Sequence, residues 1–127
     1  MNKSIFLIIL IILVTFNTCR PGITDPFLLS GHQFNFNANG DSTFVISKGS
    51  SWWFADVVLD STHYYLQHTD TTCRINYSNT NFQIKRLSCD TLFVKMSSNN
   101  SNSSRVLRIQ IAAGDYWDYL NFTQSSK

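Results

Sequence analysis

The chain has 127 residues, of which 43% are hydrophobic and 14% are charged, and its net charge at neutral pH is +2. This length suits one domain with a single core and excludes two. All eight acidic residues are Asp, and the nearly balanced charge gives no reason to expect nucleic acid or an anionic membrane surface as the partner.

Residues 1–18 have the pattern of a secretory signal peptide. Lys3 supplies a positive charge, and the run from Ile5 to Val14 is apolar and uncharged. This run is shorter than the about 20 residues that a membrane-spanning helix needs, so we expect cleavage. Cys19 follows directly, which resembles a bacterial lipoprotein signal whose cysteine becomes the lipidated first residue. The alternative is an ordinary Cys19 that pairs elsewhere.

The segment after the signal predicts a tether followed by a folded domain. Residues 19–30 contain two Pro and a Gly without regular alternation, which is typical of a linker, and the domain is expected over residues 31–127. Apolar residues then alternate with Asn from Phe34 to Ala38, and Thr43 to Ser47 is extended again. Because Asn39-Gly40-Asp41 lies between these runs, we expect a β-hairpin.

The middle of the chain predicts strands that are rich in aromatic residues. Ser51 to Leu59 carries two tryptophans, and alternation directs Trp52 to one face and Trp53 to the other. Two further runs, 72–78 and 82–88, predict a hairpin that turns near residue 81. Cys73 and Cys89 would then lie opposite each other and are a candidate disulfide if Cys19 is lipidated. The alternative is a reduced Cys73 that is buried as a small hydrophobe.

The end of the chain gives the clearest local signal. A strand over residues 92–96 is followed by a loop of Ser and Asn over 97–104 and then by two runs around Gly114-Asp115, a favourable two-residue turn. The turn sets the register, which predicts one apolar face made of Leu107, Ile109, Leu120 and Phe122. The opposite face carries Arg108, Gln110, Trp117, Tyr119, Asn121 and Thr123.

About seven to eight short strands, with no helical periodicity after residue 18, predict an all-β antiparallel sandwich. The segment FNFNANGDSTFVISKGSSWW (34–53) and the closing strands FQIKR, TLFVKMSSNN, SRVLRIQI and YLNFTQ are similar to BACON-type domains, a module of exported proteins of Bacteroidetes. The resemblance implies an immunoglobulin-like fold. It also implies a periplasmic or surface module that often accompanies carbohydrate-active enzymes and was proposed to bind glycans or mucin.

No pattern in the sequence indicates catalysis, a metal or a cofactor. His32, His63 and His68 lack metal-ligand spacing, and Asp115 and Asp118 lie beside a tight turn, where Asp is a common turn former. We therefore expect a non-catalytic binding module, held as a lipoprotein of the outer membrane that faces the periplasm or the surface.

The candidate ligand-binding residues are aromatic and polar side chains on one sheet face: Trp117, Tyr119, Arg108, Gln110, Asn121 and Trp53. Flat rings suit the C–H faces of a sugar, and the polar groups suit its hydroxyls. In one alternative, the protein is a structural or docking subunit that uses this face to contact another envelope protein. In another, the rings only pack across strands under a cover formed by residues 55–80.

Overall fold

The computed structural model describes residues 25–66 and 73–127. These residues form nine β-strands and no helix: β1 (Gln33–Phe36), β2 (Asp41–Ile46), β3 (Trp53–Leu59), β4 (Thr62–His63), β5 (Ile75–Ser78), β6 (Phe82–Ser88), β7 (Thr91–Met96), β8 (Arg105–Ala113) and β9 (Tyr116–Gln124). Within the described ranges, no helix is long and apolar enough to cross a membrane.

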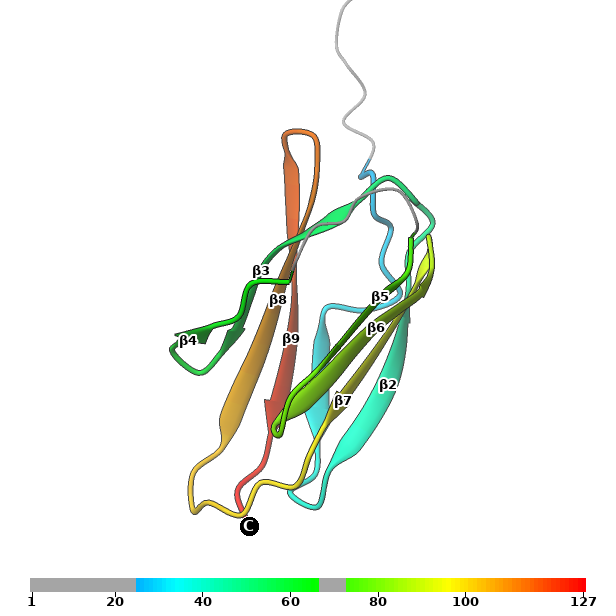
Figure 1. Cartoon of the computed structure of the whole chain (residues 1–127). Coiled ribbons are helices and arrows are strands. Elements are labelled where there is room, and N and C mark those ends of the chain that lie inside the picture. Colours follow the sequence, from blue (N-terminus) through cyan, green and yellow to red (C-terminus); the bar gives the residue numbers. More distant parts are fainter. Residues whose placement is uncertain (1–24, 67–72) are drawn as a thin grey trace, which may run out of the picture.

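The strands form two sheets that pack face to face (Figure 1). The first sheet has the order β1-β9-β8-β3-β4, and the second has the order β2-β7-β6-β5. The predicted all-β sandwich is confirmed, and the arrangement is consistent with an immunoglobulin-like fold. The β1–β9 pair is parallel, whereas the other strand pairs are antiparallel as expected.

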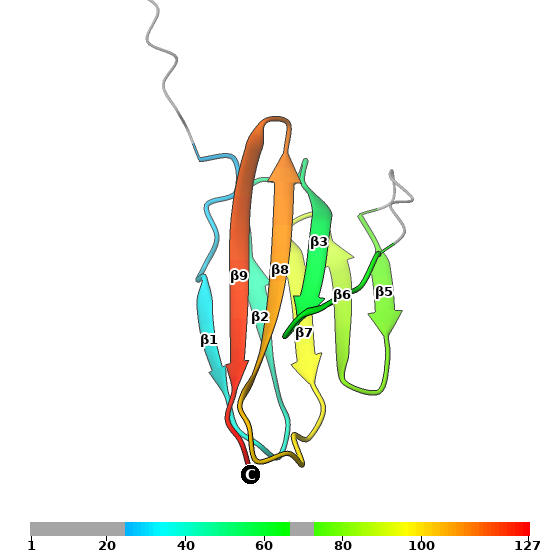
Figure 2. The same ribbon diagram turned by 90° about the vertical axis from the view of Figure 1, so that its left-hand side faces the viewer.

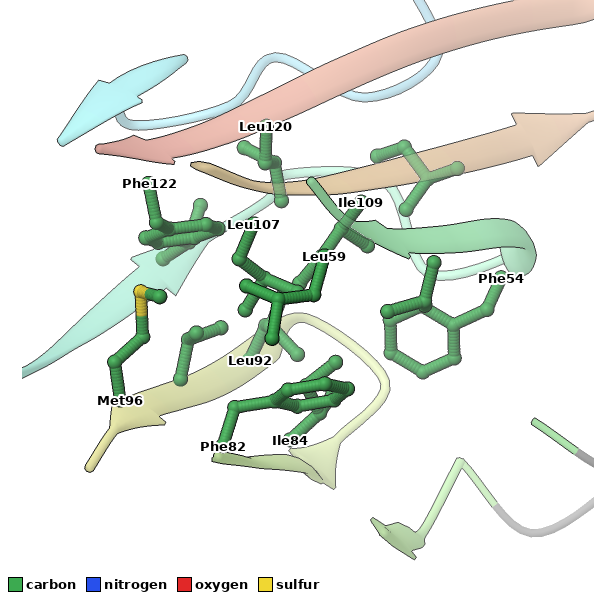
Figure 3. Packing of buried hydrophobic residues seen from close by; sticks show 14 of the residues in the cluster. Phe54, Leu59, Phe82, Ile84, Leu92, Met96, Leu107, Ile109, Leu120 and Phe122 are labelled. Atoms are coloured by element: carbon green, nitrogen blue, oxygen red, sulfur yellow. The ribbon is translucent and has the colours of Figure 1, made fainter. Parts of the chain in front are cut away.

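The core lies between the two sheets, where inward side chains of both layers meet (Figure 3). The β8–β9 hairpin has the predicted register, with Ile109 opposite Leu120 and Leu107 opposite Phe122. All four side chains are fully buried. Gly114 has a φ of 60°, which suits the first position of a tight hairpin turn. Period-two alternation and turn chemistry together therefore specified this hairpin.

The predicted hairpin around Asn39-Gly40-Asp41 is wrong, because β1 and β2 belong to different sheets. β1 pairs with β9, and β2 pairs with β7, so the turn carries the chain from one layer to the other (Figure 2). Gly40 has a φ of 101°, and a Cβ there would lie 3.1 Å from the carbonyl oxygen of Met96. Alternation identifies the buried face of a strand, but it does not identify the partner strand.

The folded domain begins before residue 31, so the expected tether is wrong for residues 25–30. Phe27 is only 2% exposed and belongs to the core. Its carbonyl accepts hydrogen bonds from the backbone N–H groups of Lys48 (2.9 Å) and Gly49 (3.4 Å). A Cβ at Gly49 would collide with the carbonyl oxygen of Pro26, so this close approach requires glycine. Residues 19–24 and the predicted signal peptide lie outside the described residues.

The structure contains the Cys73–Cys89 disulfide, with 4.6 Å between the two Cα atoms. β5 and β6 are displaced by one residue from the expected register, since Ile75 pairs with Arg86. The bond still forms because Cys89 lies in the turn after β6, where the ladder has a bulge between Arg86 and Ser88. Disulfide bonds persist in oxidising compartments, and an exported protein would lie in one.

Removing this disulfide should destabilise the domain. The cysteines are 16 positions apart in the sequence. Closing a loop of this size lowers the entropy of the unfolded chain, which stabilises the folded state by about 3 kcal/mol. We expect Cys73→Ser to lower the melting temperature by about 10–20 °C, and dithiothreitol to do the same to the wild-type protein but not to the variant. An equal melting temperature with and without reductant, at confirmed full reduction, would show that the bond contributes nothing.

Candidate functional site

The outer face of the first sheet brings the six predicted binding residues together. The strand register places them in three rows across β9, β8 and β3, and Figure 2 shows these strands side by side. The rows are Trp117–Ala112–Trp53, then Tyr119–Gln110–Asp56, and then Asn121–Arg108–Val58. Directly paired residues project from the same face of a sheet, so the three rows lie on the outer face, where Ala112 is only 5% exposed.

The rings on this face are accessible. Trp117 is 64% exposed and Tyr119 is 44% exposed, whereas Trp53 is half-buried. Residues 55–66 and 73–80, the described parts of the segment expected as a cover, leave both rings accessible. Trp52 points the other way and is buried, with its Nε1–H donating to Ser47 Oγ at 2.9 Å. One tryptophan of the pair therefore anchors the core, and the other lies on the outer face.

The polar side chains on the outer face are arranged by short-range contacts. Gln110 Nε2 donates to the hydroxyl oxygen of Tyr119 at 3.2 Å, and Arg108 Nε donates to Asn121 Oδ1 at 3.2 Å. The Arg108 guanidinium carbon lies 5.9 Å from the centre of the Tyr119 ring, within cation–π range. These contacts fix the Tyr119 ring while the terminal guanidinium nitrogens of Arg108 donate to no side chain or carbonyl of the described residues.

A hollow of about 540 Å³, here called the outer groove, lies on this face. Its lining comes from β3, the β3–β4 turn, β4, β8 and β9: Asp56, Val58, Asp60, Ser61, His63, Val106, Arg108, Gln110 and Tyr119. His63 and Asp56 form an ion pair or hydrogen bond, with 2.9 Å between Nδ1 and Oδ2. The groove therefore offers carboxylate, imidazole, guanidinium and amide groups around the phenol ring of Tyr119.

Sequence reasoning found part of this groove and missed the rest. Arg108, Gln110 and Tyr119 line it, and the other three predicted residues lie on the same face outside its lining. Asp56 and His63 were missed. A β-bulge between Phe54 and Asp56 inserts one residue into β3, so Asp56 points outward although strict alternation from Phe54 directs it inward. Cys19 lies outside the described residues.

The outer face offers groups for hydrogen bonding and rings for stacking. Among residues 25–66 and 73–127, no three His, Cys, Asp or Glu side chains lie close enough to hold a metal ion. The groove volume is within the range of small-molecule sites, which combine an apolar surface with a few oriented polar groups.

Comparison with solved structures identifies a related fold. The structure is similar to an NMR structure of a protein from Bacteroides thetaiotaomicron, with a TM-score of 0.67 and 20% identity over 87% of this chain and 95% of that chain. The two proteins share a fold. At this identity the similarity shows the fold alone.

Other comparisons give little further information. A Bacteroides ovatus GH5 xyloglucanase in complex with a XXXG heptasaccharide is similar at a TM-score of 0.45, with 12% identity over 76% of this chain and 17% of that chain, which is too weak to carry an argument. No protein-family model matches the chain. No curated protein matches it either.

Proposed function

We propose that this chain is a non-catalytic glycan-binding module of the cell envelope, a BACON-type domain anchored in the outer membrane by a lipid on Cys19. The observation that carries the proposal is the outer groove with Tyr119 in its lining and Trp117 exposed beside it. The lipid anchor is tested by mass spectrometry of the mature protein. An unmodified Cys19 would overturn the anchor and leave the groove argument intact.

The mixture of groups in the outer groove supports a sugar over an apolar partner. A sugar ring presents C–H groups on its face and hydroxyls at its edge, so it needs a flat apolar surface surrounded by donors and acceptors. Tyr119 supplies the surface, while Arg108 donates and Asp56 accepts. A protein-docking face would instead be flat, apolar and continuous.

Among the side chains that line the groove, Tyr119 should contribute most to the affinity. We expect Tyr119→Ala to weaken glycan binding about 10-fold or more, since truncating a central aromatic residue typically costs over 1 kcal/mol. Isothermal titration calorimetry against the polysaccharide that the protein binds on a glycan array measures the change. The matched control is Tyr116→Ala, because Tyr116 is also exposed (43%) and lies on β9 outside the groove lining. Equal losses in the two variants would argue against the groove.

The outer face of the second sheet favours docking as a second candidate function. Phe44 and Ile46 on β2 are 57% and 45% exposed, and the Phe44 ring lies 5.1 Å from that of Phe93 on β7. Exposed apolar side chains that gather on one face often mark a protein contact. Sedimentation velocity tests this candidate: self-association that Phe44→Lys abolishes would favour an interaction subunit, and a monomer at every concentration would count against self-docking.

A further inference from the structure

A second hollow of about 660 Å³, here called the end cleft, is lined in part by the loop between β7 and β8. This loop lies at the end of the sandwich opposite the β8–β9 turn (Figure 1). The walls of the cleft are the β3–β4 turn, Tyr64, Asn81, the 98–104 loop and Arg105. Like the outer groove, it is as large as a small-molecule site.

The outer groove and the end cleft meet at the β3–β4 turn. Asp60 and Ser61 line both hollows, so this turn forms a ridge between them. Asp60 has a φ of 55°, an uncommon conformation for a residue other than glycine. Its Oδ1 accepts from the backbone N–H of Val106 at 2.8 Å, and its own N–H donates to the Val106 carbonyl at 2.9 Å. These bonds hold the ridge against β8.

Some polar side chains of the end cleft hydrogen-bond to the protein itself, and others do not. Arg105 donates to Gln124 Oε1 and to the Ser97 carbonyl, and the Asn99 side-chain amide donates to the Ser103 and Ser125 carbonyls. In contrast, the side chains of Ser61, Thr62, Asn100 and Ser104 make no hydrogen bond to any described residue. The cleft therefore has a fixed floor and a rim with free donors and acceptors, which suits hydroxyl groups.

Together the two adjoining hollows are longer than one sugar ring. Gln110 lines the groove and Arg105 lines the cleft, five residues apart on β8. At the rise of an antiparallel strand this is about 17 Å. An extended chain can cover that distance by crossing the ridge at Asp60 and Ser61.

We infer that the ligand is an extended oligosaccharide chain that runs from the outer groove over the β3–β4 turn into the end cleft. This inference rests on the proposed glycan-binding function. The groove, which contains Tyr119, is the primary subsite. The end cleft adds hydrogen bonds to the later units of the chain, so affinity depends on chain length.

The test uses a size series made by partial hydrolysis of the polysaccharide that the protein binds on a glycan array, titrated calorimetrically into the purified protein. We expect hexamers and octamers to bind about 10-fold or more tighter than dimers. Asn100→Ala should weaken octamer binding about 3- to 10-fold and leave dimer binding unchanged. The matched control is Asn102→Ala, because Asn102 is exposed on the same loop and is not part of the cleft lining.

The outcomes separate this inference from the proposed function. If dimers and octamers bind equally and Asn100→Ala has no effect, the groove binds a glycan but the end cleft takes no part. A loss of dimer binding in Asn100→Ala would also contradict the assignment of subsites. If no polysaccharide on the array binds, both proposals fail.

Discussion

Replacing Phe122 with Ala should lower the free energy of unfolding by about 3–5 kcal/mol, the range for truncating a fully buried aromatic side chain. Phe122 is 0% exposed and lies between the sheets (Figure 3). Its ring stacks on Phe34 with 4.8 Å between centroids and contacts Phe36 with 5.6 Å. The cavity would therefore open beneath β1, an edge strand whose partner in the sheet is β9.

Urea denaturation followed by tryptophan fluorescence measures this loss. The matched control is Phe44→Ala, because Phe44 is 57% exposed on the outer face of the second sheet and should cost under about 1 kcal/mol. A cost for Phe122→Ala no larger than that of the control would mean that β1 is not packed on β9 as described.

Replacing Arg86 with Met should also cost about 3 kcal/mol or more. Arg86 is 7% exposed, and its guanidinium lies 3.7 Å from the centre of the Trp52 ring. Its terminal nitrogens donate to the carbonyls of Trp52, Ser50 and Cys89 at 2.7–2.8 Å. Met would fill the space but leave these three buried or part-buried acceptors without their donor, each at a cost of about 1–3 kcal/mol.

Burial opposes the charge at this position, and the hydrogen bonds and the contact with Trp52 offset that cost. Burial lowers the pKa of Arg86, which means that desolvation opposes the charged form. The guanidinium nevertheless stays protonated at neutral pH. We expect Arg86→Lys to recover only part of the loss, because one ammonium cannot reproduce the planar fork and its stacking on Trp52. Thermal denaturation measures both variants. Exposed Arg74→Ala is the control, and equal stability of Arg86→Lys and wild type would contradict this account.

Local sequence patterns predicted the last hairpin and failed at the first one. In the last hairpin, Gly114-Asp115 joins two runs of consistent alternation, so partner, register and faces follow from neighbouring residues. In the first, Gly40 permits both a hairpin and a turn that crosses between layers. The choice depends on distant residues, since Phe34 stacks on Phe122 near the other end of the chain. Sequence alternation carries no information on such a contact.

The same distinction applies to the candidate site. Tyr119, Gln110 and Arg108 could be placed on one face because they belong to the last hairpin. Asp56 could not, because a β-bulge in β3 exchanges the inward and outward positions after Phe54. His63 could not, because β4 pairs with β3 over only two residues. The outer groove therefore became apparent only from the three-dimensional structure.

A glycan array on the purified protein, followed by tryptophan-fluorescence titration of the polysaccharide that binds, tests the central claim most directly. We expect saturable binding, a change in fluorescence from exposed Trp117, and binding that Tyr119→Ala weakens about 10-fold or more at unchanged stability. A blank array, together with a Trp117→Ala variant that changes stability and nothing else, would contradict this claim and leave the aromatic face with a packing role.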